Sequence, residues 1–154
     1  MLVVLNNLAR TYEELGRHEE TLSMRRDVYS GFLKFNGEEH EKTLLAATNY
    51  TLSLGKLRRF KETKSWLRRT MPVARRVLGE GHGLTLKMRT LYAAALYASP
   101  GATLDDLREA VETSEEIART TRRVLGATHP NSKEIEGVLK RARAKLRARE
   151  TPEP

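Results

Sequence analysis

The sequence contains no cysteine, which excludes disulfide bridges and metal sites built from thiolates. Its N-terminal apolar run, Met1–Leu5, is too short to cross a bilayer or to form the core of a signal peptide. We therefore expect a cytosolic protein that does not engage membranes.

Sequence motifs of catalysis are absent as well. There is no Gly-rich phosphate loop, no nucleophile elbow and no His-Glu-x-x-His pattern. The adjacent carboxylates Glu13-Glu14, Glu19-Glu20 and Glu38-Glu39 would point away from each other on a helix. The sequence thus predicts neither an enzyme nor a cofactor-binding protein.

Charged residues, in contrast, are abundant. They make up 31% of the 154 residues and hydrophobic residues 39%, a composition typical of one soluble and largely helical domain. The net charge is +8. This excess favours an anionic partner, which could be nucleic acid, anionic lipid or an acidic peptide.

A repeated Gly-to-His segment divides the chain. The three copies end at His40, His82 and His129, so that His82 follows His40 by 42 residues and His129 follows His82 by 47. The five extra residues of the last interval fit a Ser-Pro-Gly loop between Tyr97 and Thr103, because insertions in helical repeats occur in loops. In that loop, Thr103 and Asp106 resemble a capping box that opens the next helix.

Two helices are predicted in each repeat, because apolar residues recur at steps of three and four. The first helix pair is expected at about residues 2–15 and 19–35. Gly37, Gly79 and Gly126 are expected to end the second helices in the left-handed conformation. The three histidines are expected near helix N-caps. They are too far apart to share a metal ion, because neighbouring repeats are about 10 Å apart.

One domain is predicted over residues 1–150, followed by a disordered tail at 150–154. Within it we expect repeat 1 at about 1–39, repeat 2 at about 40–81, repeat 3 at about 82–128 and a capping helix at about 129–149. Pro72 lies inside the second helix of repeat 2, where we expect a kink. His18 is expected to be a partly buried core residue.

Several segments resemble the tetratricopeptide units of kinesin light chain. The resemblance rests on Leu5–Ala9, Leu15–Glu20 and Leu125–Pro130, and it covers most of the chain. Repeats 2 and 3 depart from it, with Thr48–Thr51 and Thr90–Ala93 in place of the Asn-Asn-Leu-Ala pattern. The resemblance implies an all-α fold, an α-α superhelix (TPR-like solenoid) of about three helix-turn-helix repeats plus a C-terminal capping helix. It also implies a scaffold or adaptor that binds a partner protein.

In that family the first helix of each repeat lines a concave groove that binds peptides. Carried over by repeat position, the resemblance implies that groove-facing residues include Val3 and Leu45, and that the peptide-binding groove is formed by Asn6, Arg10, Glu13, Thr48, Asn49, Leu52, Lys56, Lys87, Thr90 and Tyr97. The asparagine amides could pair with a peptide backbone, the cations with acidic groups, and Leu52 and Tyr97 with a hydrophobic anchor. These residues could instead form an ordinary solvated helix face.

Two basic clusters leave the class of partner open. One surrounds the turn of repeat 2 (Lys56, Arg58, Arg59, Lys61, Lys64, Arg68 and Arg69), and the other lies on the last helix (Lys140, Arg141, Arg143, Lys145, Arg147 and Arg149). Our first prediction is an acidic peptide of a partner protein. The alternatives are a nucleic-acid-binding helical repeat, disfavoured because Tyr97 is the one aromatic platform in the groove, and an oligomerisation element.

The N-terminal helix has apolar residues on more than one face, which a terminal repeat usually avoids. An uncovered apolar surface indicates that something stacks on it. We therefore expect either that the chain is a piece of a longer array or that it forms a homodimer through its N-terminal helix pair.

Overall fold

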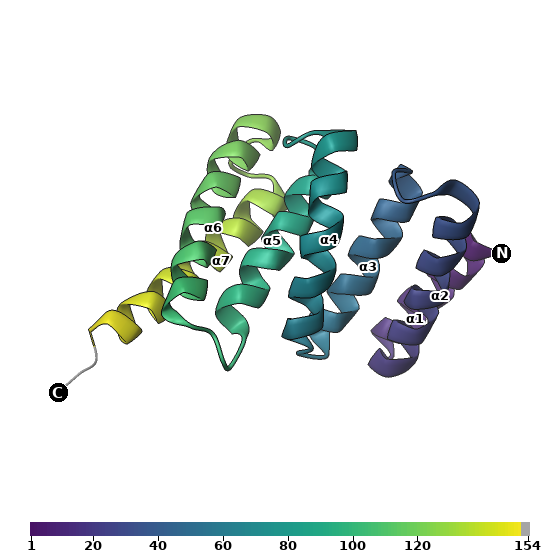
Figure 1. Cartoon of the computed structure of the whole chain (residues 1–154), viewed down its shortest axis with the longest axis horizontal. Coiled ribbons are helices and arrows are strands. Elements are labelled where there is room, and N and C mark those ends of the chain that lie inside the picture. Colours follow the sequence, from purple (N-terminus) through teal and green to yellow (C-terminus); the bar gives the residue numbers. More distant parts are fainter. Residues whose placement is uncertain (152–154) are drawn as a thin grey trace. The chain divides into compact units, whose positions relative to one another are not determined.

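The computed structural model describes residues 1–151, and all regular secondary structure in that range is helical (Figure 1). In chain order the helices are α1 (Leu2–Glu14), α2 (His18–Asn36), α3 (Glu41–Lys56), α4 (Phe60–Leu78), α5 (Gly83–Ala98), α6 (Leu104–Leu125) and α7 (Pro130–Glu150). The predicted all-α superhelical repeat fold is confirmed. No helix within residues 1–151 is long and apolar enough to cross a membrane.

The chain divides into two compact units, unit 1 (Met1–Gly79) and unit 2 (from Glu80 onward). In unit 1, α2 packs against both α1 and α3, and α3 packs in turn against α4. In unit 2, α6 packs against α5 and α7, which also contact each other. The prediction of one domain over residues 1–150 stays a prediction.

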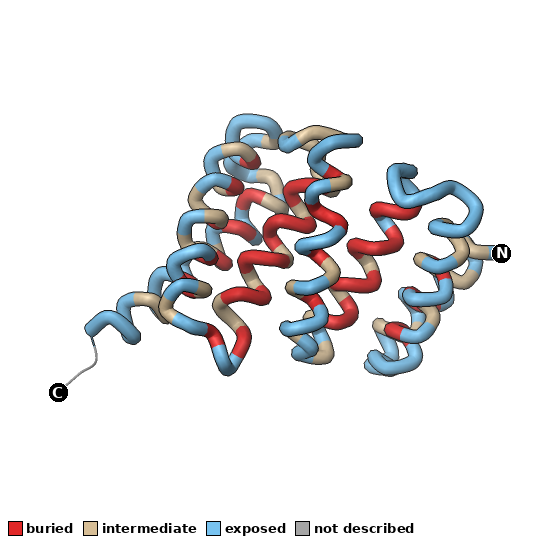
Figure 2. The backbone as a smooth tube through the Cα atoms, in the orientation of Figure 1, coloured by how far each residue is buried: buried red, intermediate tan, exposed pale blue. Residues whose placement is uncertain are grey.

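Each unit has its own apolar core. In unit 1, Leu22, Tyr50 and Leu54 form a buried cluster against which Leu57 and Trp66 pack. The unit 2 cluster consists of Leu86, Ala93, Ile117, Ile135 and Val138. Buried residues are concentrated along α3 and α5, whereas Ala9 is the buried residue of α1 (Figure 2).

The three repeated histidines cap helices as predicted. His40, His82 and His129 are the N-caps of α3, α5 and α7, and the Nδ1 atom of each accepts a hydrogen bond of 3.1 Å from the backbone N–H two residues further on. The capping box of Thr103 and Asp106 at the start of α6 is also confirmed. These caps satisfy backbone donors that a helix start leaves without partners.

The left-handed conformation predicted for the repeated glycines is confirmed for φ but not for ψ. Gly37, Gly79 and Gly126 have φ values of 80°, 90° and 88°, as the left-handed region requires, but their ψ values are 172°, 163° and 158°. Each glycine N–H still donates to the carbonyl four residues earlier, and the chain then leaves the helix in an extended direction. This combination of angles is open almost exclusively to glycine.

Gly37→Ala is therefore expected to destabilise the protein by about 2 kcal/mol, because alanine is strained at these angles. No atom lies within 4 Å of the Cβ that the substitution adds, so the cost is conformational rather than steric. Gly55, inside α3, has equally open surroundings, and Gly55→Ala should stabilise the protein by about 0.5 kcal/mol. Urea unfolding followed by circular dichroism measures both, and equal effects of the two substitutions would contradict the expectation.

Some local expectations need correction. His18 is exposed at the first position of α2 rather than part of the core, because the side chains of that first turn face solvent. Glu150, placed in the tail by the sequence, is the last residue of α7, and residues 152–154 of the predicted tail lie outside the described residues. The helix α4 continues through Pro72, and the kink expected there stays a prediction.

The N-terminal helix is apolar and exposed on its outer face, as the sequence suggested. Met1, Val4, Leu8 and Leu15 are exposed, and no side chain caps the start of α1. Stacking or homodimerisation through this helix pair stays a prediction.

Candidate functional site

Two residues of the predicted groove, Asn6 and Asn49, line the same hollow in unit 1. This hollow, called the unit 1 hollow below, has a volume of about 170 Å³ and is formed by α1, α2 and α3. Its lining residues are Val3, Asn6, Val28, Phe32, Lys42, Leu45, Ala46 and Asn49. Val3 and Leu45 were also among the groove-facing positions that the resemblance implied.

The unit 1 hollow is mainly apolar. Val28 and Ala46 are fully buried, and Phe32 is half-buried beside them. Val3 on α1 and Leu45 on α3 are exposed hydrophobic residues that line the same hollow. A hydrophobic side chain entering here would exchange water for apolar contacts on more than one side.

The two asparagine side chains add polar recognition to this apolar surface. Neither carboxamide has a hydrogen-bond partner elsewhere in residues 1–151. A carboxamide offers both a donor and an acceptor, which is the same pair of groups that a peptide bond presents. Asn49 is also fixed in place, because its backbone oxygen accepts a hydrogen bond of 3.0 Å from Arg25.

Lys42 is a lining residue that the sequence reasoning missed. Its ammonium group is exposed and forms no ion pair with any described residue. The signal was present in the sequence, because Lys42, Leu45 and Asn49 are separated by three and then four residues and so share one face of α3. The unit 1 hollow therefore has an available cation beside its apolar lining.

Glu13 and Lys56, both predicted to face a ligand, are instead held by an ion-pair network. The Glu13 carboxylate lies 2.7 Å from Arg25 and 2.7 Å from Lys56. Arg25, buried on α2, also donates to the Ser53 hydroxyl at 2.7 Å. The network joins α1, α2 and α3, the three helices that form the unit 1 hollow. Contact of Glu13 and Lys56 with a ligand stays a prediction.

The network also sets the protonation state of Glu13. Burial by itself would raise the pKa of this carboxyl, but the hydrogen bond from Lys56 and the charge and hydrogen bond of Arg25 outweigh burial, so the pKa is lowered. Glu13 is consequently ionised at neutral pH and keeps both cations as partners.

The remaining predicted groove residues are also engaged within the chain or buried. The hydroxyls of Thr48 and Thr90 are buried and donate to the carbonyls of Leu44 and Leu86, at 2.8 and 2.9 Å. Arg10 forms an exposed ion pair with Glu14, and Leu52 is half-buried. Their role in a site stays a prediction.

In unit 2 the C-terminal helix engages Lys87 and Tyr97, two of the three predicted groove residues of α5. Lys87 lies 2.8 Å from the Glu134 carboxylate, and the Tyr97 hydroxyl accepts a hydrogen bond of 2.8 Å from Arg141. The Tyr97 ring packs against the unit 2 core. These residues therefore bind α7, which sequence periodicity on α5 could not reveal.

Most cations of the two basic clusters have partners inside the protein. On α7, Arg143 pairs with Glu115, while Lys145 and Arg149 donate to backbone carbonyls of Tyr97 and Ala102. Around the turn of repeat 2, Arg59 pairs with Glu62, and Arg58 and Arg69 lie over the rings of Phe60 and Trp66. Most of these cations therefore contact groups within the protein, which weakens the hypothesis that the clusters bind phosphates.

Comparison with known proteins agrees with this architecture. Residues 43–83, which span α3 and α4, match the family model of the tetratricopeptide repeat. Such repeats generally mediate protein–protein interactions and are generally not enzymes. No curated protein matches the chain.

Three solved structures illustrate the similarity in fold. TPR-like repeats of a Podosopora anserina protein assigned as a kinesin light chain give a TM-score of 0.66 at 20% identity, covering 99% of this chain and 77% of that one. A second crystal structure of such repeats from the same organism gives 0.58 at 17% identity over 97% and 95%. BtubC (BKLC) from P. vanneervenii gives 0.61 at 14% identity over 99% and 66%.

These similarities confirm the resemblance drawn from the sequence. Residues 43–83 are a tetratricopeptide repeat, and the chain as a whole has the fold of repeat proteins of the kinesin light chain type.

Proposed function

We propose that this protein is a scaffold or adaptor module that binds an extended peptide segment of a partner protein in the unit 1 hollow. A hydrophobic side chain of the peptide occupies the apolar surface over Val28 and Ala46. The peptide main chain pairs with the carboxamides of Asn6 and Asn49, and an acidic group of the peptide pairs with Lys42. We place this function in the cytosol, as the sequence predicts.

The observation that carries the proposal is the pair of unpartnered carboxamides beside an apolar hollow. Asn6 and Asn49 come from different helices, α1 and α3, and both line the same 170 Å³ space. Polar groups at the edge of an apolar pocket typically fix the orientation of a ligand, whereas the apolar surface supplies the buried area.

An acidic partner is favoured because the cation that lines this hollow has no counterion in the described chain. Lys42 lacks an ion pair, whereas Lys56 and Lys87 are each bound to an internal carboxylate. An acidic peptide can therefore neutralise Lys42 without displacing an internal partner. The net charge of +8 also steers an acidic segment toward the protein.

The double substitution Asn6→Ala and Asn49→Ala is expected to weaken peptide binding at least tenfold, because each lost hydrogen bond costs about 1 kcal/mol. Fluorescence anisotropy with labelled acidic peptides that carry one hydrophobic anchor measures the affinity. Asn7→Ala is the matched control, since Asn7 is an exposed neighbour on α1 that does not line the hollow. Lys42→Glu should reverse the preference for acidic over basic peptides.

A second titration uses a mixed-sequence RNA oligonucleotide at low and high salt. Weak binding that is unaffected by the asparagine substitutions is the expected result. If instead RNA binds and the acidic peptides do not, with an affinity that falls steeply as salt rises, a nucleic-acid-binding repeat replaces the peptide adaptor. Peptide binding that survives the double substitution unchanged would place the groove elsewhere.

A further inference from the structure

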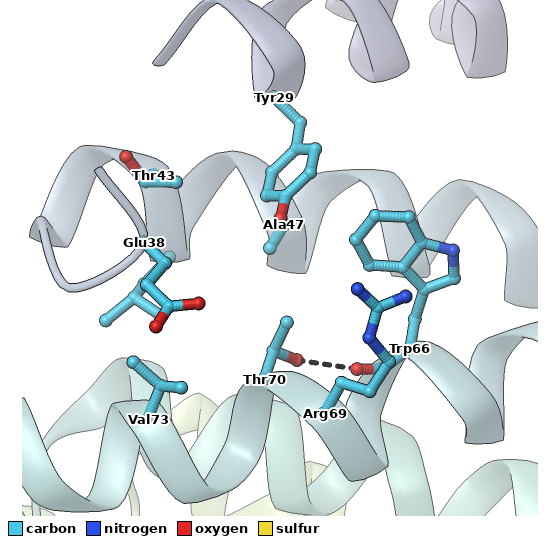
Figure 3. Close-up of a pocket in the computed structure, with 9 residues that line it drawn as sticks. Tyr29, Glu38, Thr43, Ala47, Trp66, Arg69, Thr70 and Val73 are labelled. Carbon is cyan, nitrogen blue, oxygen red and sulfur yellow. Dashed lines mark hydrogen bonds between the residues drawn. The ribbon is translucent and has the colours of Figure 1, made fainter. Parts of the chain in front are cut away.

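A second hollow of about 90 Å³ lies in unit 1 between α2, α3 and α4 (Figure 3). It is distinct from the unit 1 hollow, because the two hollows share no lining residue. Tyr29, Trp66 and Val73 provide ring and aliphatic surface, and Glu38 lines it from the segment between α2 and α3. We call it the aromatic hollow.

The aromatic residues of this hollow are held in fixed geometry. Trp66 packs edge-to-face with Tyr29, with ring centroids 5.0 Å apart, and in a similar way with Tyr50 at 5.1 Å. The guanidinium of Arg69 lies 5.4 Å from the Trp66 ring centroid. Such contacts from three sides pre-organise the indole ring.

Glu38 brings a carboxylate without a counterion to this preformed surface. Its neighbour Glu39 pairs with Arg76 at 2.7 Å, but Glu38 forms no ion pair with any residue in the described range. Glu38 thus places a negative charge at this hollow in a chain whose net charge is +8. Figure 3 shows its carboxylate facing the open space, with Arg69 on the far side.

Two further groups lining the hollow have unused hydrogen-bonding capacity. The Thr43 hydroxyl oxygen is buried and has no hydrogen-bond partner among the described residues. Tyr29 also lines the hollow, and burial raises the pKa of its hydroxyl, while the charge of Arg69 opposes the rise and that of Glu38 adds to it. The Tyr29 hydroxyl is therefore neutral at physiological pH, and its oxygen can still accept a hydrogen bond.

We propose that the aromatic hollow binds a lysine or arginine side chain of a partner protein. The positively charged end pairs with Glu38, and the oxygen of Tyr29, which also lines the hollow, is a further acceptor. The aliphatic stem of the side chain lies against Trp66 and Val73. Charge complementarity selects this occupant, because an unpaired carboxylate lacks the cation that such a side chain supplies.

Arg69 does not supply that cation itself. It makes no ion pair with Glu38 in the structure and instead lies over Trp66. Its position across the hollow closes the side opposite Glu38. Because Arg69 repels a second cation weakly from there, Arg69→Met should leave the affinity for a basic ligand unchanged or raise it.

Trp66 makes this proposal directly measurable, because it is the one tryptophan of the sequence. The probes are the Nα-acetyl methylamides of lysine and arginine, with those of norleucine and glutamate as uncharged and acidic counterparts. Tryptophan fluorescence is expected to change saturably with the two basic probes, at millimolar concentration, and not with the other two. Glu38→Gln should lower that affinity about tenfold, the effect of losing a charged hydrogen bond.

Glu39→Gln is the matched control, since it removes the same charge one residue away and should change the affinity less than about twofold. Both variants alter exposed residues, so unchanged fluorescence before titration verifies that they fold.

Three results would each overturn the proposal. They are equal responses to the lysine and norleucine probes, no response to either basic probe, and an affinity that Glu38→Gln leaves unchanged. Binding of the glutamate probe that Arg69→Met abolishes would identify an anion site instead. The proposal is independent of the peptide site, because the Asn6 and Asn49 substitutions should leave this titration unchanged.

Discussion

Arg25→Ala is expected to destabilise unit 1 by about 3 kcal/mol. Arg25 is 6% exposed and bridges three helices through Glu13, Ser53 and the backbone oxygen of Asn49. Its removal leaves Glu13, whose side chain is 15% exposed, with Lys56 as the one remaining cation. Breaking one side of a largely buried ion pair costs more than the pair contributes, because the Glu13 charge is then compensated only in part, by Lys56.

The measurement is urea unfolding followed by the fluorescence of Trp66, which reports on unit 1. Arg26→Ala is the control at the next position of α2, where the side chain is exposed and has no partner among residues 1–151. It should change the free energy of unfolding by less than about 0.5 kcal/mol. If the two substitutions cost the same, the Arg25 network does not hold α1, α2 and α3 together.

The same substitution should also weaken peptide binding. Arg25 donates to the backbone oxygen of Asn49, and the network fixes α1 relative to α3 across the unit 1 hollow. Its loss therefore frees both carboxamides to move, and ordering them again on binding costs affinity. Glu13 and Lys56 belong to the same network, and their contact with a ligand stays a prediction.

The local features of the fold could be predicted because they depend on nearby residues. Each histidine cap joins residues two positions apart, and the capping box joins Thr103 to Asp106, three positions on. Both therefore depend only on residues that are adjacent in the sequence. For Gly37 the sign of φ could be predicted from the need for glycine. Its ψ depends on where the chain goes after the helix, which a sequence pattern does not contain.

The candidate site could be predicted in part for the same reason. Asn6 and Asn49 lie on the first helices of successive repeats, so the repeat period places both near the same space. The pairing of Lys56 with Glu13, or of Lys87 with Glu134, joins residues more than 40 positions apart. The sequence contains many carboxylates that could pair with each lysine, and the partner is determined by how the helices pack. Tyr97 was likewise predicted to contact a ligand, but in the structure it packs against the unit 2 core and its hydroxyl accepts a hydrogen bond from Arg141 of α7.

Ile117→Ala is expected to lower the free energy of unfolding by about 3–4 kcal/mol. Ile117 is fully buried on α6 and packs in one cluster with Leu86, Ile135 and Val138. The cavity removes contacts that neighbouring helices of unit 2 make with one another, and a close-packed core collapses only partly around it. Val124→Ala, at an exposed position of the same helix, should cost less than about 1 kcal/mol.

The Ile117 substitution also tests the prediction of a single domain, because Trp66 lies in unit 1 and Ile117 in unit 2. Stacked repeats gain stability from their neighbours, so in a short array a weakened repeat lowers the stability of the others. Circular dichroism, which reports on all helices, and Trp66 fluorescence should therefore shift together to lower urea concentration. A Trp66 transition that stays in place while part of the helical signal is lost earlier would show two domains that unfold separately. The peptide site of unit 1 would then function without unit 2, and residues 80–150 would be free to serve a different partner.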